Sequence, residues 1–103
     1  MVINILQWTE REPPTEATIR RKLQAEGLQP YRWSNGPGDV YSAHAHSYHK
    51  VIYVVSGSIT FGLPNDGQQV HLRPGDRLEL PPDVVHDAVV GPHGVVCLEA
   101  HRA

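Results

Sequence analysis

The sequence predicts an all-β protein, a sandwich or a barrel, with one short helix near its N-terminus. Nine glycines and nine prolines divide the 103 residues into short segments, as the turns of an all-β fold do. The segments between them are about five residues long, rich in apolar and β-branched residues, and recur at the spacing of such strands. A chain of this length has room for one domain but not for two, so we expect residues 1–103 to form a single domain.

Each expected element follows from the local pattern. The helix is expected at residues 16–26, because Ile19 and Leu23 lie on one face and Gly27 suits its C-terminal end. With Leu28, these residues should cap one end of the barrel or pack on its outer sheet. The strand at residues 2–8 is open to pairing with the sheet edge of a neighbouring chain. Further strands are expected at residues 28–34, 40–46, 50–55, 58–63, 69–72, 77–80, 86–90 and 95–100.

Composition and charge exclude several classes of protein. Nine Lys plus Arg against eleven Asp plus Glu give a formal charge of −2, which argues against a basic nucleic-acid binder. No apolar run approaches the roughly 20 residues of a membrane span, and the first residues do not resemble a signal peptide. Cys97 has no partner for an internal disulfide and is expected to be a buried, inert thiol. We therefore expect a cytoplasmic protein without nucleic-acid or membrane partners.

Histidine is frequent, with seven in the chain. His44 and His46 are two residues apart in a strand-like segment, so their side chains point to the same face. His86 begins a later strand, which antiparallel pairing can bring beside the first pair. Three neutral imidazoles suit one divalent transition metal (Fe, Mn, Co, Ni, Cu or Zn) and leave positions open for water or substrate. We predict that these three residues are the metal ligands.

The spacing of glycines and histidines resembles the two sequence motifs of the cupin superfamily. Residues 38–57 resemble the first motif, with Gly38, five residues, His44-Ala45-His46, three residues, Lys50, six residues and Gly57. Residues 75–90 resemble the second, with Gly75, five residues, Pro81-Pro82-Asp83, two residues, His86, three residues and Val90. The resemblance implies a double-stranded β-helix, or jelly-roll barrel, that includes the strands from residue 28 onward. Because cupins often dimerise, it also implies a homodimer.

Three positions depart from the cupin pattern. Lys50 occupies the place of the ligand Glu, and Asp83 and Val90 occupy the places of a Gly and an Asn. Asp tolerates the geometry of a turn, and Val makes the barrel wall more apolar. Three-histidine cupins without the Glu are known, so the resemblance still implies a metal site.

Lys50 changes the chemistry expected of the site. By strand parity, His44, His46, Tyr48, Lys50 and Ile52 share one face, which the resemblance makes the inner face. Lys50 is then a neutral amine that ligates the metal or acts as a general base, or an ammonium balanced by an anionic substrate. Alternatively, the Lys50 side chain extends out of the barrel to the solvent. We predict that Lys50 and Tyr48 are the catalytic residues, although a Tyr at such a position often only packs at a barrel mouth.

Other candidates have weaker arguments. His49 lies on the opposite face, and only a bulge would turn it inward as a fourth ligand. Tyr41 and Tyr53 have outward parity, which predicts packing on the outer face. Glu99 is either an acid near the barrel or a solvated residue. No role is assigned to the remaining histidines, His71, His93 and His101.

The leading hypothesis is a metal-dependent enzyme of the dioxygenase, isomerase or lyase type, acting on a small anionic or enolisable molecule. One alternative is a sensor or carrier that binds a small ligand without catalysis. The other is a metal-free protein whose histidines act as acid and base, as in the sugar epimerases of the cupin superfamily.

Overall fold

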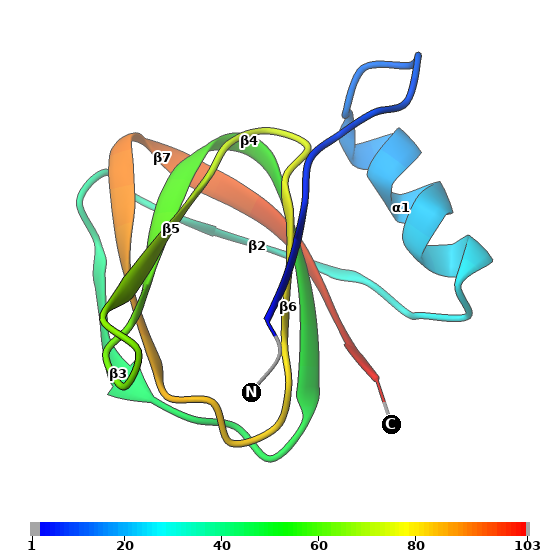
Figure 1. The fold of residues 1–103 in the computed structure, drawn as a ribbon. Helices are drawn as coiled ribbons and strands as arrows, with labels where there is room; N and C mark the ends of the chain where they lie inside the picture. The colour runs from blue at the N-terminus through cyan, green and yellow to red at the C-terminus, as the bar shows by residue number, and fades with distance from the viewer. Residues whose placement is uncertain (1–2, 103) are drawn as a thin grey trace.

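A computed structural model describes residues 3–102, which form an antiparallel β-barrel with a helix outside it (Figure 1). This architecture confirms the predicted all-β class and the double-stranded β-helix. The sheet order in the described residues is β1-β6-β4-β7-β2, with β3 paired to β7 and β5 paired to β4. The strands are β1 (Asn4–Leu6), β2 (Tyr31–Asn35), β3 (Val40–His44), β4 (His49–Leu63), β5 (Gln68–Leu72), β6 (Arg77–Leu80) and β7 (His86–Arg102).

Two long bent strands, β4 and β7, pair along almost their whole length, from His49 opposite Arg102 to Gly62 opposite Asp87. The prediction of two strands in each of these segments is wrong, because both strands bend without ending. At the bend, Gly57 and Gly94 adopt positive φ angles of 75° and 76°, a conformation that favours glycine. The two strands therefore change direction together while their pairing continues past the bend, with register shifts on either side of Ser56.

The N-terminal strand β1 pairs with β6 of the same chain, with Asn4 opposite Glu79 and Leu6 opposite Arg77. The described part of this segment therefore joins the sheet of its own chain, at the end of the sheet order, and pairing of its other edge with a neighbouring chain stays a prediction. Val2, where the expected strand begins, lies outside the described residues.

The helix α1 (Glu16–Ala25) has the predicted start and ends one residue early. A reciprocal capping box between Thr15 and Thr18 begins it. Gly27 ends it with a φ of 79°, and its N–H donates to Gln24 O at 2.9 Å. No helix in residues 3–102 has the length and apolar character needed to cross a membrane.

A second apolar cluster joins α1 to the outer face of β4 and β7. Ile19 and Leu23 are fully buried there, together with Leu28, Val51, Tyr53, Leu98 and Ala100. The helix was expected either to cap one end of the barrel or to pack on its outer sheet, and in the structure it packs on the outer sheet. The helix lies outside the barrel in Figure 1, so it leaves the barrel interior free.

An ionic cluster strengthens this attachment. The guanidinium of Arg77, 4% exposed, donates to both carboxylate oxygens of Glu26, at 2.6 and 2.9 Å, and to the hydroxyl of Tyr53 at 3.2 Å. It also donates to Glu79 at 2.8 Å. Two carboxylates on a single guanidinium give a buried, well-directed network that links the C-terminal end of α1 to β6.

Candidate metal centre

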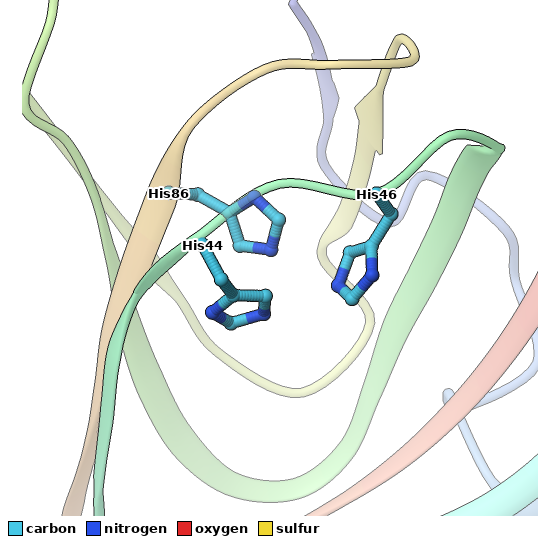
Figure 2. Close-up of side chains that lie close together, drawn as sticks. All are labelled: His44, His46 and His86. Atoms are coloured by element: carbon cyan, nitrogen blue, oxygen red, sulfur yellow. The ribbon is translucent and has the colours of Figure 1, made fainter.

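Three histidines converge inside the barrel (Figure 2). His44 ends β3 and lies directly opposite His86, the first residue of β7. His46 comes from the loop between β3 and β4. One ring nitrogen from each residue lies within 4.8 Å of the corresponding nitrogens of the other two, so the structure brings together the three residues that the sequence singled out.

Hydrogen bonds to the backbone fix the orientation of two of these rings. The Nδ1–H group of His44 donates to Ser42 O at 2.6 Å, and that of His86 donates to Val84 O at 2.9 Å. Because a carbonyl oxygen only accepts, each Nδ1 carries the proton and each Nε2 keeps its lone pair. This is the tautomer that binds a metal through Nε2.

The turn before β7 holds the loop that carries His46. The N–H of Asp83 donates to His46 O at 2.7 Å, and Asp83 itself has a φ of 66°. The Asp that replaces the family's Gly therefore accepts the left-handed turn, as expected for this residue type. The bond couples the position of His46 to the turn that precedes His86.

The environment favours the neutral form of two of these imidazoles, those of His46 and His86. Burial lowers the pKa of His46, and the nearby positive charge of Lys50 lowers it further. Burial and Lys50 also lower the pKa of His86, against the opposing effect of its bond to Val84 O. The Nε2 atoms of His46 and His86 are buried without a hydrogen-bond partner in the described residues, which is costly unless something else binds them. A set of three imidazoles, two of them with unsatisfied buried nitrogens, fits a divalent transition metal.

The three histidines open into a cavity of about 180 Å3, called here the barrel pocket. Tyr48 stacks against His46, with ring centroids 4.7 Å apart, and against His101 on its other side, at 3.7 Å. The Tyr48 side chain therefore points inward, as predicted. The barrel pocket is lined by Trp33, Tyr41, His44, His46, Tyr48, Lys50, Ile59, Phe61, His86, Ala88 and Glu99.

Lys50 also points into the barrel pocket, where its charge has a partner that the sequence did not reveal. Its Nζ lies 3.7 Å from Oε1 of Glu99, and the two side chains are only 10% and 5% exposed. Glu99 also accepts hydrogen bonds from Trp33 Nε1 at 3.0 Å, from His101 Nε2 at 2.8 Å and from the Tyr31 hydroxyl. Burial alone would raise the pKa of Glu99, but the charge of Lys50 and these hydrogen bonds outweigh it and lower the pKa.

Two expectations about tyrosine side chains have different outcomes. Tyr41 lines the barrel pocket and packs against Trp33 with ring centroids 6.1 Å apart, so its predicted outward placement is wrong. A bulge between Tyr41 and His44 shifts the register of β3, which breaks the alternation of faces. Tyr53 lies on the outer face as predicted.

The other histidines lie away from the three ligand candidates. His49 faces outward, where Nε2 contacts Oε1 of Glu79 at 2.8 Å, so no bulge turns it inward. His71 and His93 are exposed, in agreement with their having no assigned role. His101 is different, because it binds Glu99 and stacks on Tyr48.

Glu99 is the main residue that the sequence reasoning left undecided. One signal was available: Glu99 is two residues from Cys97, and residues two apart in a strand share a face. Cys97 was expected to be buried, and in the structure its burial raises the pKa of its thiol to about 12. Cys97 is fully buried, as expected. An acid at such a position needs a buried cation, and Lys50 was the available one.

Comparison with known families agrees with the fold and the histidine spacing. A family model described as a cupin domain matches residues 31–98, more than half of the chain. The chain belongs to the cupin family. Its match includes β2 to β6 and most of β7, and therefore all of the residues that line the barrel pocket except Glu99.

This cupin resembles two proteins named as enzymes and a further cupin of known structure. It is 39% identical over 62 residues to quercetin 2,3-dioxygenase of Bacillus subtilis, a match that covers 58% of this chain and 18% of that protein. Among solved structures, an RmlC-like cupin from Shewanella frigidimarina is 31% identical with a TM-score of 0.62, over 72% of this chain and 64% of that one. A DMSP lyase structure is 28% identical with a TM-score of 0.67, over 74% and 38%. This chain therefore spans less than two thirds of each of these proteins.

Proposed function

We propose that this cupin is an enzyme that binds one divalent transition metal through His44, His46 and His86 and acts on a small anionic or enolisable molecule. The observation that carries the proposal is the convergence of three imidazoles, two with buried Nε2 atoms lacking a partner in the described residues, at a cavity that also contains Lys50. A metal held there would supply Lewis-acid polarisation of a substrate oxygen.

The roles of the other residues follow from their contacts. Lys50 forms an ion pair with Glu99 and presents hydrogen-bond donors to the substrate. Tyr48, stacked between His46 and His101, is held rigidly enough to orient its hydroxyl toward the same molecule. Ile59, Phe61 and Ala88 form an apolar wall that excludes water from the reacting atoms.

The relatives support two of the three reaction types. The match to a quercetin 2,3-dioxygenase supports oxygen-dependent chemistry, and the likeness to a DMSP lyase supports elimination. An isomerase reaction remains the third type, because the same polarised oxygen promotes proton transfer at the adjacent carbon.

Metal analysis tests the metal site. Untagged protein is analysed by elemental mass spectrometry, together with His44→Ala and the control His71→Ala, which changes an exposed histidine bonded to Thr60. We expect about one equivalent of metal in the wild type and in the control, and little in His44→Ala. No metal in the wild type, even after soaking with each candidate ion, would contradict the proposal.

Turnover then separates an enzyme from a binding module. The metal-loaded protein is incubated with small organic acids and enolisable carbonyl compounds, and product formation and oxygen uptake are followed. Stoichiometric binding without product would favour the sensor alternative, and turnover that survives full metal removal would favour acid–base catalysis by the histidines. The convergence of His44 and His46 argues against the metal-free alternative, for which we expect these rings to lie apart.

We also expect a homodimer, as is frequent in this family. Light scattering at micromolar concentration checks it, and a monomeric mass would contradict it.

A further inference from the structure

We infer that the barrel pocket recognises a short carboxylate with a second oxygen on the adjacent carbon, that is, an α-hydroxy or α-oxo acid. Lys50 and Tyr48 bind the carboxylate, and the second oxygen takes an open position of the metal. The inference rests on the proposed function, because the second oxygen needs the metal held by His44, His46 and His86.

The first support is a pair of polar groups whose donors are free. The Nζ of Lys50 is 3.7 Å from Glu99 Oε1, which is an ion pair but too long for a hydrogen bond. Its three N–H groups therefore remain available. In residues 3–102 the Tyr48 hydroxyl has no hydrogen-bond partner either, and its ring stacks on His46 at the same pocket. An ammonium and a hydroxyl on one pocket wall suit a carboxylate.

The second support is the charge of the barrel pocket. Both carboxylate oxygens of Glu99 are already engaged: Trp33 donates to Oε1, which Lys50 faces as an ion-pair partner, and Tyr31 and His101 donate to Oε2. The charges of Lys50 and Glu99 cancel, and none of the other residues that line the pocket is an Asp, Glu, Lys or Arg. His101, 35% exposed behind Glu99, adds positive charge only when protonated. An anion therefore gains a net attraction when the metal supplies its charge.

The third support is size. The cavity of about 180 Å3 equals roughly six water molecules at about 30 Å3 each, which is the space of a short-chain acid. Ile59, Phe61 and Ala88 leave an apolar wall for its hydrocarbon part. Because the cavity is small, one compact molecule must reach the metal, Lys50 and Tyr48 together, as a carboxylate with an adjacent oxygen does.

The test uses the full chain loaded with Co(II), whose visible spectrum reports its ligands. Glycolate, acetate and glycolamide are titrated in turn, with calorimetry as a second readout. Glycolate has both oxygens and the charge, acetate lacks the second oxygen, and glycolamide lacks the charge. We expect glycolate to bind at least about tenfold more tightly than either, and to bind metal-free protein only weakly.

A charge-balanced variant isolates the contribution of Lys50. The double variant Lys50→Met/Glu99→Gln removes the ion pair without leaving a buried unpaired charge. We expect it to bind Co(II) as the wild type does and to bind glycolate about tenfold or more weakly. Lys50→Arg, which keeps the charge, should lose less. His71→Ala should change neither affinity.

The outcomes distinguish this inference from the proposed function. If wild type binds neither Co(II) nor any of the other candidate ions, both are overturned. If Co(II) binds but glycolate has no advantage over glycolamide, or if the double variant binds glycolate as tightly as the wild type, only the inference is overturned.

Discussion

Nζ of Lys50 lies 3.7 Å from Oε1 of Glu99 inside the barrel, and both side chains are almost fully buried. The cation stands at the position where the cupin pattern has a ligand carboxylate. The carboxylate inside this barrel belongs to Glu99 of β7, which lies opposite Ile52 of β4 in the strand pairing. The ion pair holds the Lys50 side chain at the pocket. Because Glu99 is paired with Lys50, the candidate metal ligands are the three histidines.

The stability of this pair is measurable by a double-mutant cycle on metal-free protein. Lys50→Met leaves the Glu99 charge buried without a cation, which costs about 3 kcal/mol of unfolding free energy, since Trp33, Tyr31 and His101 still donate to it. Lys50→Met/Glu99→Gln should be more stable than the sum of the single changes predicts. Urea denaturation measures the four proteins, and strictly additive effects would contradict a direct interaction.

Acid sensitivity should depend on Glu99. Its pKa is lowered from 4.5, because Lys50 and the hydrogen bonds outweigh the effect of burial. The carboxylate therefore contributes stability that is complete above the unfolded pKa of 4.5 and is lost as pH falls through the lower folded pKa. Glu26 and Glu79 have lowered pKa values too, so wild type must be compared with Glu99→Gln. We expect the difference in Tm between the two metal-free proteins to shrink from neutral pH to about pH 3. A difference that does not change with pH would show that Glu99 does not titrate in this way.

The bend of β4 and β7 should be intolerant of side chains at Gly57. A Cβ there would lie 2.8 Å from the carbonyl carbon of Gly94 and closer still to its oxygen, at a φ of 75°. We expect Gly57→Ala to cost about 3 kcal/mol or more. Gly67 is a matched control, because it has a φ of 64° and a Cβ added there would have no neighbouring atom within 4 Å, so Gly67→Ala should cost only about 1 kcal/mol. If urea denaturation gave equal losses of unfolding free energy for Gly57→Ala and Gly67→Ala, the contact with Gly94 would be unimportant.

The ionic cluster on the outer face should affect stability without affecting metal binding. Arg77→Met leaves Glu26 and Glu79 without their main partner, although Arg102 still contacts both. We expect a loss of about 3 kcal/mol with unchanged Co(II) affinity. Arg21→Met removes an ion pair with Glu12 in which both side chains are more than half exposed, and it should change stability by less than about 1 kcal/mol. A loss of Co(II) binding in Arg77→Met would contradict the separation of the two clusters.

The ligand candidates were predictable because their signals are local. His44 and His46 are separated by one residue, and His86 follows a turn whose left-handed residue is Asp83, with a φ of 66°. Such spacings are visible in a single sequence, and so was the inward parity of Tyr48 and Lys50. The four-residue spacing of Ile19 and Leu23 and the position of Gly27 are also local signals, which is why the helix was located to within one residue.

Errors occurred where pairing with distant strands changes the local pattern. Tyr41 was assigned to the wrong face, because the bulge before His44 depends on how β3 pairs with β7. The turns expected at Gly57 and Gly94 are bends inside continuous strands, since pairing between β4 and β7 continues past both glycines.

The sequence by itself determined the all-β class, the helix, the cupin motifs and the three histidines that approach one another. Only the tertiary structure decided the environment of Lys50. Glu99 lies far from Lys50 in the chain and is a lone acid in an apolar strand, which strand alternation alone can place either in solvent or in the barrel. The position of Glu99 was decided by the register of β7 between β2 and β4, which brings Tyr31, Trp33, Lys50 and His101 around one carboxylate. A buried charge is tolerated only where such partners meet it, and those partners come from three different strands.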